Sequence, residues 1–181
     1  EIDKAVALAK EIDGVVFLDV QPGQSTVERE VEAILPYLKQ PQIHLGIDPE
    51  FAMKNGRKPG EYIGTLDASE INNVIGILSK VVNENNLPPK VLVIHRFTEN
   101  MVTNYQNITP TKEVQVIIEM DGWGTAELKT AIYRQIITNE PVQFAGVKLF
   151  YKNDLRSPST RLLTPSEILD WNPQPSYVQY Q

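Results

Sequence analysis

The fold of this chain is indicated most directly by the stretch VLVIHR at residues 91–96, where four apolar residues lead into a histidine and an arginine. Three of the four are β-branched, which favours a strand. Strands that are apolar almost throughout and turn polar at their carboxyl ends are typical of parallel sheets that are covered by helices and carry a binding site at their mouth. Five further runs share this character: 15–19, 43–48, 114–121, 146–151 and 177–180. Six parallel strands are therefore predicted.

Helical patterns stand between these runs, with apolar residues spaced three and four apart. The predicted helices cover residues 1–12, a segment that begins at the N-cap Ser25 with Glu28 as its capping-box partner, 67–85, 126–138 and a segment that begins at Thr164. Alternating strands and helices predict a parallel sheet, either open and doubly wound or closed as a (β/α) barrel. The barrel is favoured because nearly every strand ends in a polar residue, whereas a doubly wound sheet gathers its ligand groups at one switch point.

A complete barrel of this kind has eight strands, two more than the sequence supplies. We therefore expect residues 1–181 to form a single α/β domain, a parallel (β/α) barrel of the TIM type that comprises its last six strand-helix units. The N-terminal strand units would then lie outside this sequence. If the sequence were complete, it would instead form an open six-stranded sheet.

The amino-acid composition limits the kinds of partner that this chain can be expected to bind. The 17 Lys and Arg residues are scattered and the formal net charge is −6, so no basic surface for nucleic acid is predicted, and a neutral or cationic ligand is accommodated more easily. The absence of cysteine excludes disulfides and thiol catalysis. No apolar run reaches the roughly 18 residues of a transmembrane helix. The sequence leaves the oligomeric state open.

Two pairs of carboxylates follow predicted strands. Asp48 and Glu50 lie just beyond one strand, and Glu119 and Asp121 end another with both side chains on one face. Cleavage of a glycosidic bond requires two such groups, one protonated to release the leaving group and one ionised as nucleophile or base. Each carboxylate has an alternative interpretation as a helix cap or as the partner of a lysine or arginine.

His95 shares a face of its strand with Val91 and Val93, so it is predicted to point into the barrel as a general acid, a general base or a hydrogen-bond donor. The alternative is a histidine that is satisfied by a neighbouring carboxylate. Metal binding is less favoured because His44 is the only other histidine and no zinc-binding spacing occurs. No cofactor is predicted, since the sequence lacks both nucleotide-binding glycine loops.

Lys148 lies in an otherwise apolar strand. A lysine buried there must be paired or must lose its proton, and a neutral amine in a barrel can capture a carbonyl substrate as a Schiff base. An ion pair with Glu119 or Asp121 on the preceding strand is the favoured interpretation, because an unpaired buried charge is costly.

Further polar and aromatic residues are placed to line the mouth. Trp123 follows Asp121 in the turn DGWG, where its ring could stack on a sugar or simply anchor the loop. The residues predicted to bind substrate are Asp19, Gln21, Arg96, Trp123, Lys148, Tyr151 and Gln179.

Several ordered motifs resemble a family of bacterial exported proteins that are often labelled lipoproteins and have no established activity. The motifs are LDVQPG at 18–23, DPEF at 48–51, PG at 59–60 with IG at 63–64, PPKVLV at 88–93 leading to His95 and Phe97, MDG at 120–122 and KLFY at 148–151. The resemblance covers almost the whole chain. It implies a (β/α)8 barrel outside the cytoplasm, with further strand units and an export signal before these segments. The lipid-bearing cysteine of a lipoprotein is missing from this sequence.

These observations favour an acid/base hydrolase of the glycoside-hydrolase type, acting on a cell-envelope or environmental polysaccharide. Its predicted catalytic residues are Asp48, Glu50, His95, Glu119 and Asp121. A non-catalytic barrel that binds a saccharide or another envelope component is the first alternative, and a Schiff-base lyase or aldolase that uses Lys148 is the second. Carboxylates whose environments separate their pKa values would favour catalysis over binding.

Overall fold

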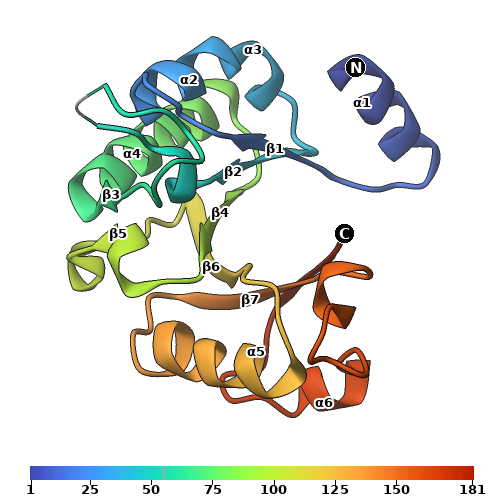
Figure 1. Ribbon diagram of the computed structural model, residues 1–181. Coiled ribbons are helices and arrows are strands. Elements are labelled where there is room, and N and C mark those ends of the chain that lie inside the picture. Colours follow the sequence, from blue (N-terminus) through green and yellow to red (C-terminus); the bar gives the residue numbers. More distant parts are fainter. Residues whose placement is uncertain (55) are drawn as a thin grey trace.

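A curled sheet of six parallel strands forms the centre of this mixed α/β structure, a computed structural model that describes every residue except 55 (Figure 1). The strands follow the order β1-β2-β4-β6-β7-β8 and together make a half-barrel. Their bounds are β1 Val16–Val20, β2 Ile43–Ile47, β4 Lys90–Arg96, β6 Val114–Met120, β7 Phe144–Leu149 and β8 Tyr177–Tyr180. All six predicted strands are thus confirmed, within one or two residues at most ends.

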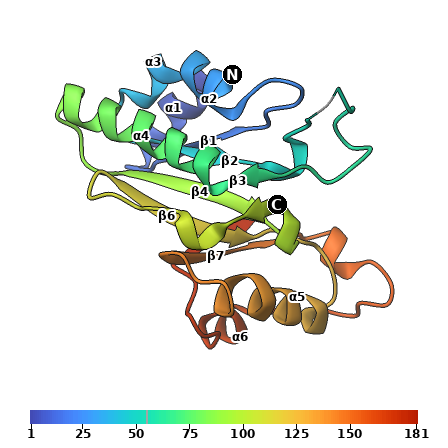
Figure 2. The same cartoon turned by 90° about the vertical axis from the view of Figure 1, so that its left-hand side faces the viewer.

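Helices cover the two halves of the sheet separately, with α1 to α4 over one half and α5 and α6 over the other (Figure 2). Their bounds are α1 Ile2–Glu11, α2 Val27–Ala33, α3 Leu35–Leu38, α4 Ala68–Asn85, α5 Ala126–Tyr133 and α6 Pro165–Leu169. A π-helical turn, η4 Arg134–Thr138, continues α5. The sheet therefore has a convex face that packs on the helices and a concave face that lines the inside of the half-barrel.

Local sequence explains where the helices begin. Asp67 and Thr164 are N-caps with complete capping boxes to Glu70 and Glu167, as predicted. The first cap differs by one residue, because the hydroxyl of Thr26, not that of Ser25, accepts the hydrogen bond from the backbone N–H of Arg29. The following helix is split in two at Ile34, since Pro36 has no N–H to continue its hydrogen-bond ladder.

The connection from β4 to β6 contains no α-helix, which corrects the expectation of six regular strand-helix units. It holds two short 3-10 turns, η2 Glu99–Met101 and η3 Tyr105–Asn107, and a two-residue strand, β5 Val102–Thr103. β5 pairs in parallel with β3 Leu66–Asp67 in a small separate sheet. This segment is rich in Thr and Asn, which compete for backbone hydrogen bonds, and no helical spacing of apolar residues offsets them.

Period-two alternation separates two apolar layers. Side chains on the convex face form the main core with the helices: Leu45, Ile47, Leu92, Ile94, Val116, Ile118 and Val147. On the concave face the ring of Phe17 lies 5.1 Å from that of Tyr177 and 5.3 Å from that of His44. Because β1 and β8 stand at opposite ends of the strand order, the contact between Phe17 and Tyr177 shows how strongly the sheet curls.

His44 gives the fold a specific pH dependence. Its Nδ1 accepts a hydrogen bond from the backbone N–H of Val91 at 3.1 Å, and burial, with the charge of Lys90 as a smaller cause, lowers its pKa from 6.5 to about 4. Between pH 6.5 and 4 the histidine is protonated in the unfolded chain but stays neutral in the folded chain. The free energy of unfolding therefore falls as the pH drops from 6.5 to 4.

We expect this titration to contribute up to roughly 3 kcal/mol across that pH interval. His44→Asn, whose amide oxygen can accept from the same N–H without titrating, should unfold in urea with a weaker pH dependence than the unmodified chain. If the free energy of unfolding changed with pH in the same way in both proteins, a neutral buried His44 would be contradicted.

Candidate active site at the carboxyl ends of the strands

The strand register brings the predicted polar residues of four strands to one end of the sheet. Asp19 pairs with Gly46, His95 pairs with Glu119, and Glu119 pairs with Gly146. All these strands are parallel, so their carboxyl ends and the loops that follow them share one edge. A layer of ionisable side chains therefore crosses the concave face there.

His95 is the centre of this layer. Its Nδ1 lies 2.8 Å from Oε2 of Glu119 and 3.3 Å from Oδ2 of Asp121, and its Nε2 lies 3.3 Å from Oδ1 of Asp19. The imidazole side chain is only 3% exposed. Burial alone would lower the pKa of His95, but the contacts with Asp121, Asp19 and Glu119 outweigh it and raise the pKa well above its usual value. These contacts therefore favour the protonated ring.

Two glycines on the concave face make room for these side chains. A Cβ atom on Gly46 would overlap Oδ1 of Asp19 and lie 3.4 Å from Nε2 of His95. A Cβ atom on Gly146 would lie 2.9 Å from Cγ2 of Ile117 and 3.3 Å from Cβ of Glu119. Absence of a side chain at residue 46 thus lets the Asp19 carboxylate reach across β2 to the histidine on β4.

A cavity of about 340 Å³ opens directly above this layer. Among its lining residues are six of the predicted site residues: Gln21, Asp48, Glu50, Asp121, Trp123 and Lys148. Phe51, Phe97 and Phe150 supply apolar walls, and the Trp123 ring is 51% exposed at the mouth. The size and the mixture of aromatic and polar walls suit a small polar ligand with an apolar face.

The carboxyl groups in and below this cavity have distinct environments. Burial raises the pKa of Asp48, and Asp121 adds to this effect, although His95 acts to lower the pKa. The carboxylate oxygens of Asp48 accept hydrogen bonds from the backbone N–H of Glu50 at 3.0 Å and from the side-chain amide of Gln21 at 3.4 Å. Burial and the neighbouring carboxylates also raise the pKa of Glu50. Fully buried Glu119 has its pKa raised by burial despite the counteracting His95.

Glu50 and Asp121 bring carboxyl groups from two different turns to the cavity. Among the described residues, the Glu50 side chain makes no hydrogen bond or ion pair within the chain. Asp121 contacts His95 through Oδ2, while its Oδ1 is buried and has no hydrogen-bond partner. The turn after β2 and the turn after β6 thus each contribute one carboxyl group to the cavity wall.

Lys148 lines the cavity without the expected ion pair. Of the carboxylate oxygens in the described part of the chain, none lies within 4.0 Å of its Nζ, which instead lies 5.4 Å from the centre of the Phe150 ring. The predicted pairing with Glu119 or Asp121 is therefore wrong. A cationic amine is left facing the ligand space.

Six predicted residues do not line the cavity: Asp19, His95 and Glu119 form the layer beneath it, and Arg96, Tyr151 and Gln179 lie outside both. Arg96 is buried and turned away, bound to Glu140 and to the carbonyls of Thr98 and Glu99, so it anchors the loop after β4. Tyr151 is exposed and stacks on Tyr180 at 5.6 Å. Gln179 pairs with Lys148 in the register, and its amide oxygen is buried without a partner.

Lys129 and Asp154 fix the loops around the cavity and were not identified from the sequence. The buried Lys129 Nζ donates to the carbonyls of Gly122 at 2.7 Å and Lys148 at 2.8 Å, and it lies 3.3 Å from Asp154 Oδ2. Asp154 in turn accepts from the backbone N–H groups of Gly124 and Phe150, both at 2.9 Å. Helix α5 carries Lys129 on an apolar face, and a lone lysine at such a position is the signal that could have identified it.

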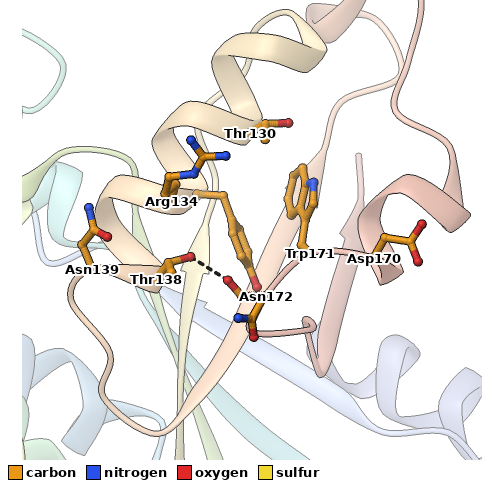
Figure 3. Close-up of a pocket in the computed structure, with 8 residues that line it drawn as sticks. Thr130, Arg134, Thr138, Asn139, Asp170, Trp171 and Asn172 are labelled. Atoms are coloured by element: carbon orange, nitrogen blue, oxygen red, sulfur yellow. Dashed lines mark hydrogen bonds between the residues drawn. The ribbon is translucent and has the colours of Figure 1, made fainter.

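Two other hollows, of about 370 and 530 Å³, lie along α5 and α6 and share Thr130, Arg134, Asp170 and Trp171. Figure 3 shows the smaller one, where the Thr138 hydroxyl donates to the backbone carbonyl of Asn172. Trp171 packs on Tyr133 with ring centres 4.5 Å apart. Because these groups serve the packing of α5 against the segment after α6, and no predicted site residue lies here, the site is assigned to the cavity above His95.

Comparisons with protein-family models, curated proteins and solved structures find no match to this chain. Within the described residues, no three or more histidine and carboxylate groups are arranged to hold a metal ion. No helix in the described part of the chain has both the length and the apolar character needed to cross a membrane.

Loss of Lys129 should destabilise the loops around the cavity. We expect Lys129→Met to lower the free energy of unfolding by about 3 to 5 kcal/mol, because it leaves the buried carboxylate of Asp154 without its cation. The exposed Lys112 supplies the matched control, and Lys112→Met should change stability by less than about 0.5 kcal/mol. Urea denaturation measures the stability of both variants, and equal losses in the free energy of unfolding would contradict the role assigned to Lys129.

Proposed function

We propose that this protein is an acid/base hydrolase that cleaves a glycosidic bond in the cavity above His95. The observation that carries the proposal is the presence of carboxyl groups from two different turns, those of Glu50 and Asp121, in one cavity with a half-exposed tryptophan. Two carboxyl groups with different protonation requirements are what glycosidic cleavage needs.

Glu50 is the proposed general acid. Its pKa is raised by burial, by Asp48 and by Asp121, so it holds a proton at a higher pH than an ordinary glutamate. In the reaction it gives this proton to the glycosidic oxygen as the bond to the leaving sugar breaks. Asp48 supports it, because its Oδ1 accepts from the backbone N–H of Glu50 and fixes the turn.

Asp121 is the proposed nucleophile or base. Nδ1 of the His95 ring lies 3.3 Å from Oδ2 of Asp121. In the reaction the carboxylate either attacks the anomeric carbon or takes a proton from the attacking water. Trp123 would stack on the apolar face of a sugar ring, and Lys148 would donate to a sugar hydroxyl. Glu119 and His95 act below the cavity as supporting charges.

We further propose that the six strands belong to an eight-stranded barrel of the TIM type and that the substrate is a cell-envelope or environmental polysaccharide met outside the cytoplasm. The curled, all-parallel sheet with polar carboxyl ends supports the first part. The second part rests on the motifs that resemble exported proteins.

Exchange of either proposed catalytic carboxyl should abolish turnover and preserve the fold. We expect Glu50→Gln and Asp121→Asn each to lower kcat by about 10²- to 10⁴-fold, since an amide keeps the shape but cannot transfer the proton or attack. The assay is hydrolysis of synthetic glycosides and polysaccharides from pH 4 to 8, with thermal unfolding recorded for each variant. Asp170→Asn, on the outer hollow, is the matched control and should leave kcat unchanged.

If the unmodified protein cleaves none of these substrates yet is retained on a saccharide column, the alternative of a non-catalytic binding barrel replaces the hydrolase. Retention should then require Trp123 and should survive Asp121→Asn. The two readouts therefore separate catalysis from binding.

The unpaired amine of Lys148 favours a second candidate function, a lyase or aldolase that forms a Schiff base. Incubation with glyceraldehyde and borohydride tests it, because an imine formed with loss of water is reduced to a stable secondary amine. Under the hydrolase proposal we expect Lys148 to be labelled no faster than exposed Lys80, as measured by peptide mass mapping. Selective labelling of Lys148 would favour the lyase.

A further inference from the structure

His95 has three carboxylate neighbours, and they divide unequally between its two ring nitrogens. Glu119 and Asp121 both face Nδ1, at 2.8 and 3.3 Å, whereas Asp19 alone faces Nε2, at 3.3 Å. The Nε2 contact with Asp19 has hydrogen-bond geometry, whereas Nδ1 has no hydrogen-bond partner among the described residues. A neutral imidazole with its single proton on Nε2 would donate to Asp19 but would turn the lone pair of Nδ1 toward Glu119 and Asp121, so a proton on each nitrogen suits all three neighbours.

The charge of the doubly protonated ring matters because two carboxylates share the Nδ1 side. Glu119 is fully buried and Asp121 is 9% exposed, and with a neutral ring the two carboxyls would face each other without a counter-charge. Like charges at such a site lead one carboxyl to take up a proton. A charged ring lessens this repulsion, because it acts against the burial that raises the pKa of Glu119.

The other ionisable groups that face this cluster do not supply the missing charge. Asp48 on the β2 side acts on His95 as a further negative group, and Tyr177 on β8 lies near Glu119 and Asp19 as a neutral phenol. Lys148 on β7 influences Glu119 and Glu50 but makes no ion pair within 4.0 Å. The positive charge of the cluster therefore depends on the ring itself.

We propose that Asp19 is a positioning residue that holds the His95 ring in place beside Asp121, and that the glycine at residue 46 leaves the space for this contact. The role assigned to Asp121 in turnover rests on the proposed function, but the contacts among Asp19, His95 and Asp121 do not. Asp19 is not among the residues that line the cavity, and its side chain is 42% exposed.

Gly46 offers an uncharged way to break the same contact. A methyl group there would occupy the position of Asp19 Oδ1 and push the carboxylate off Nε2. The backbone of Gly46 lies in an ordinary strand conformation that alanine can adopt. Gly46→Ala should therefore reproduce the effect of Asp19→Asn without removing any ionisable group.

Nuclear magnetic resonance of the imidazole nitrogens in the full chain tests the proposal directly, because the chain has only two histidines and His44→Asn assigns the signals. We expect Asp19→Asn and Gly46→Ala each to lower the titration midpoint of His95 by about 1 to 3 pH units, the range for loss of a close charge partner. The double variant should add little to either single change, since both remove one contact. The signals of His44 serve as the internal control.

The carboxyl carbon signals of Glu119 and Asp121 are followed in the same samples, with Asp121→Asn as the assignment. We expect the pH-dependent change of the Glu119 signal to move to higher pH in Asp19→Asn, because a less charged ring counteracts the burial of Glu119 less. Where hydrolysis is measurable, the profile of kcat against pH should move in the same direction while KM changes little.

An unchanged His95 titration in both variants, with circular dichroism showing an intact fold, would overturn the proposal. So would a lowered His95 titration that leaves the Glu119 carboxyl signal unchanged. Absence of hydrolysis by the unmodified chain, combined with the expected shifts, would refute the proposed function and leave the role of Asp19 standing.

Discussion

The placement of one buried histidine among three carboxylates is the constraint on which the site depends. A charged ring that is nearly inaccessible to water is tolerated only if counter-charges lie in contact with it. The register supplies them, because it sets His95 directly beside Glu119, while two glycines clear the space for the side chains on either side. Loss of the register by one residue would turn His95 into the apolar core and leave the carboxylates unpaired.

The convex face provides the apolar support for this polar layer. Alternate residues of β2, β4 and β6 pack against α4 and its neighbours, and they carry the hydrophobic contribution to folding. The concave face is apolar only in its lower part, where Phe17, His44 and Tyr177 fill the interior. The convex face thus supplies most of the apolar contacts that stabilise the fold, and the concave face carries the ionisable residues of the site.

Most of the fold could be predicted because its signals are local. Apolar runs marked the six strands, and capping boxes at Asp67 and Thr164 marked two helix starts. The connection after β4 was missed because an arginine can fix a loop through carbonyls far along the chain, and nothing in the sequence around Arg96 shows which carbonyls it will reach.

The location of the site was predictable for the same reason, since parallel strands present their carboxyl ends together, and six of the expected residues line one cavity. Their partners were not predictable. Lys129 binds backbone carbonyls of two loops, and Lys148 faces the cavity without an ion pair, although both lysines stand in apolar surroundings in the sequence. Whether such a lysine binds carbonyl oxygens or faces the cavity without an ion pair depends on distances across the fold.

The separate helical coverage of the two halves of the sheet affects the geometry of the cavity. Asp48 and Glu50 follow β2 in the half beneath α4, whereas Asp121 follows β6 and Lys148 lies in β7. The halves meet along the β4–β6 ladder, which has no α-helix in its connection, and the contact of Arg96 with Glu140 spans the same boundary. The distance between the two carboxylate turns therefore depends on the twist of the β2–β4 and β4–β6 pairs, and a small rotation about the β4–β6 pair would widen or narrow the gap in which a ligand must fit.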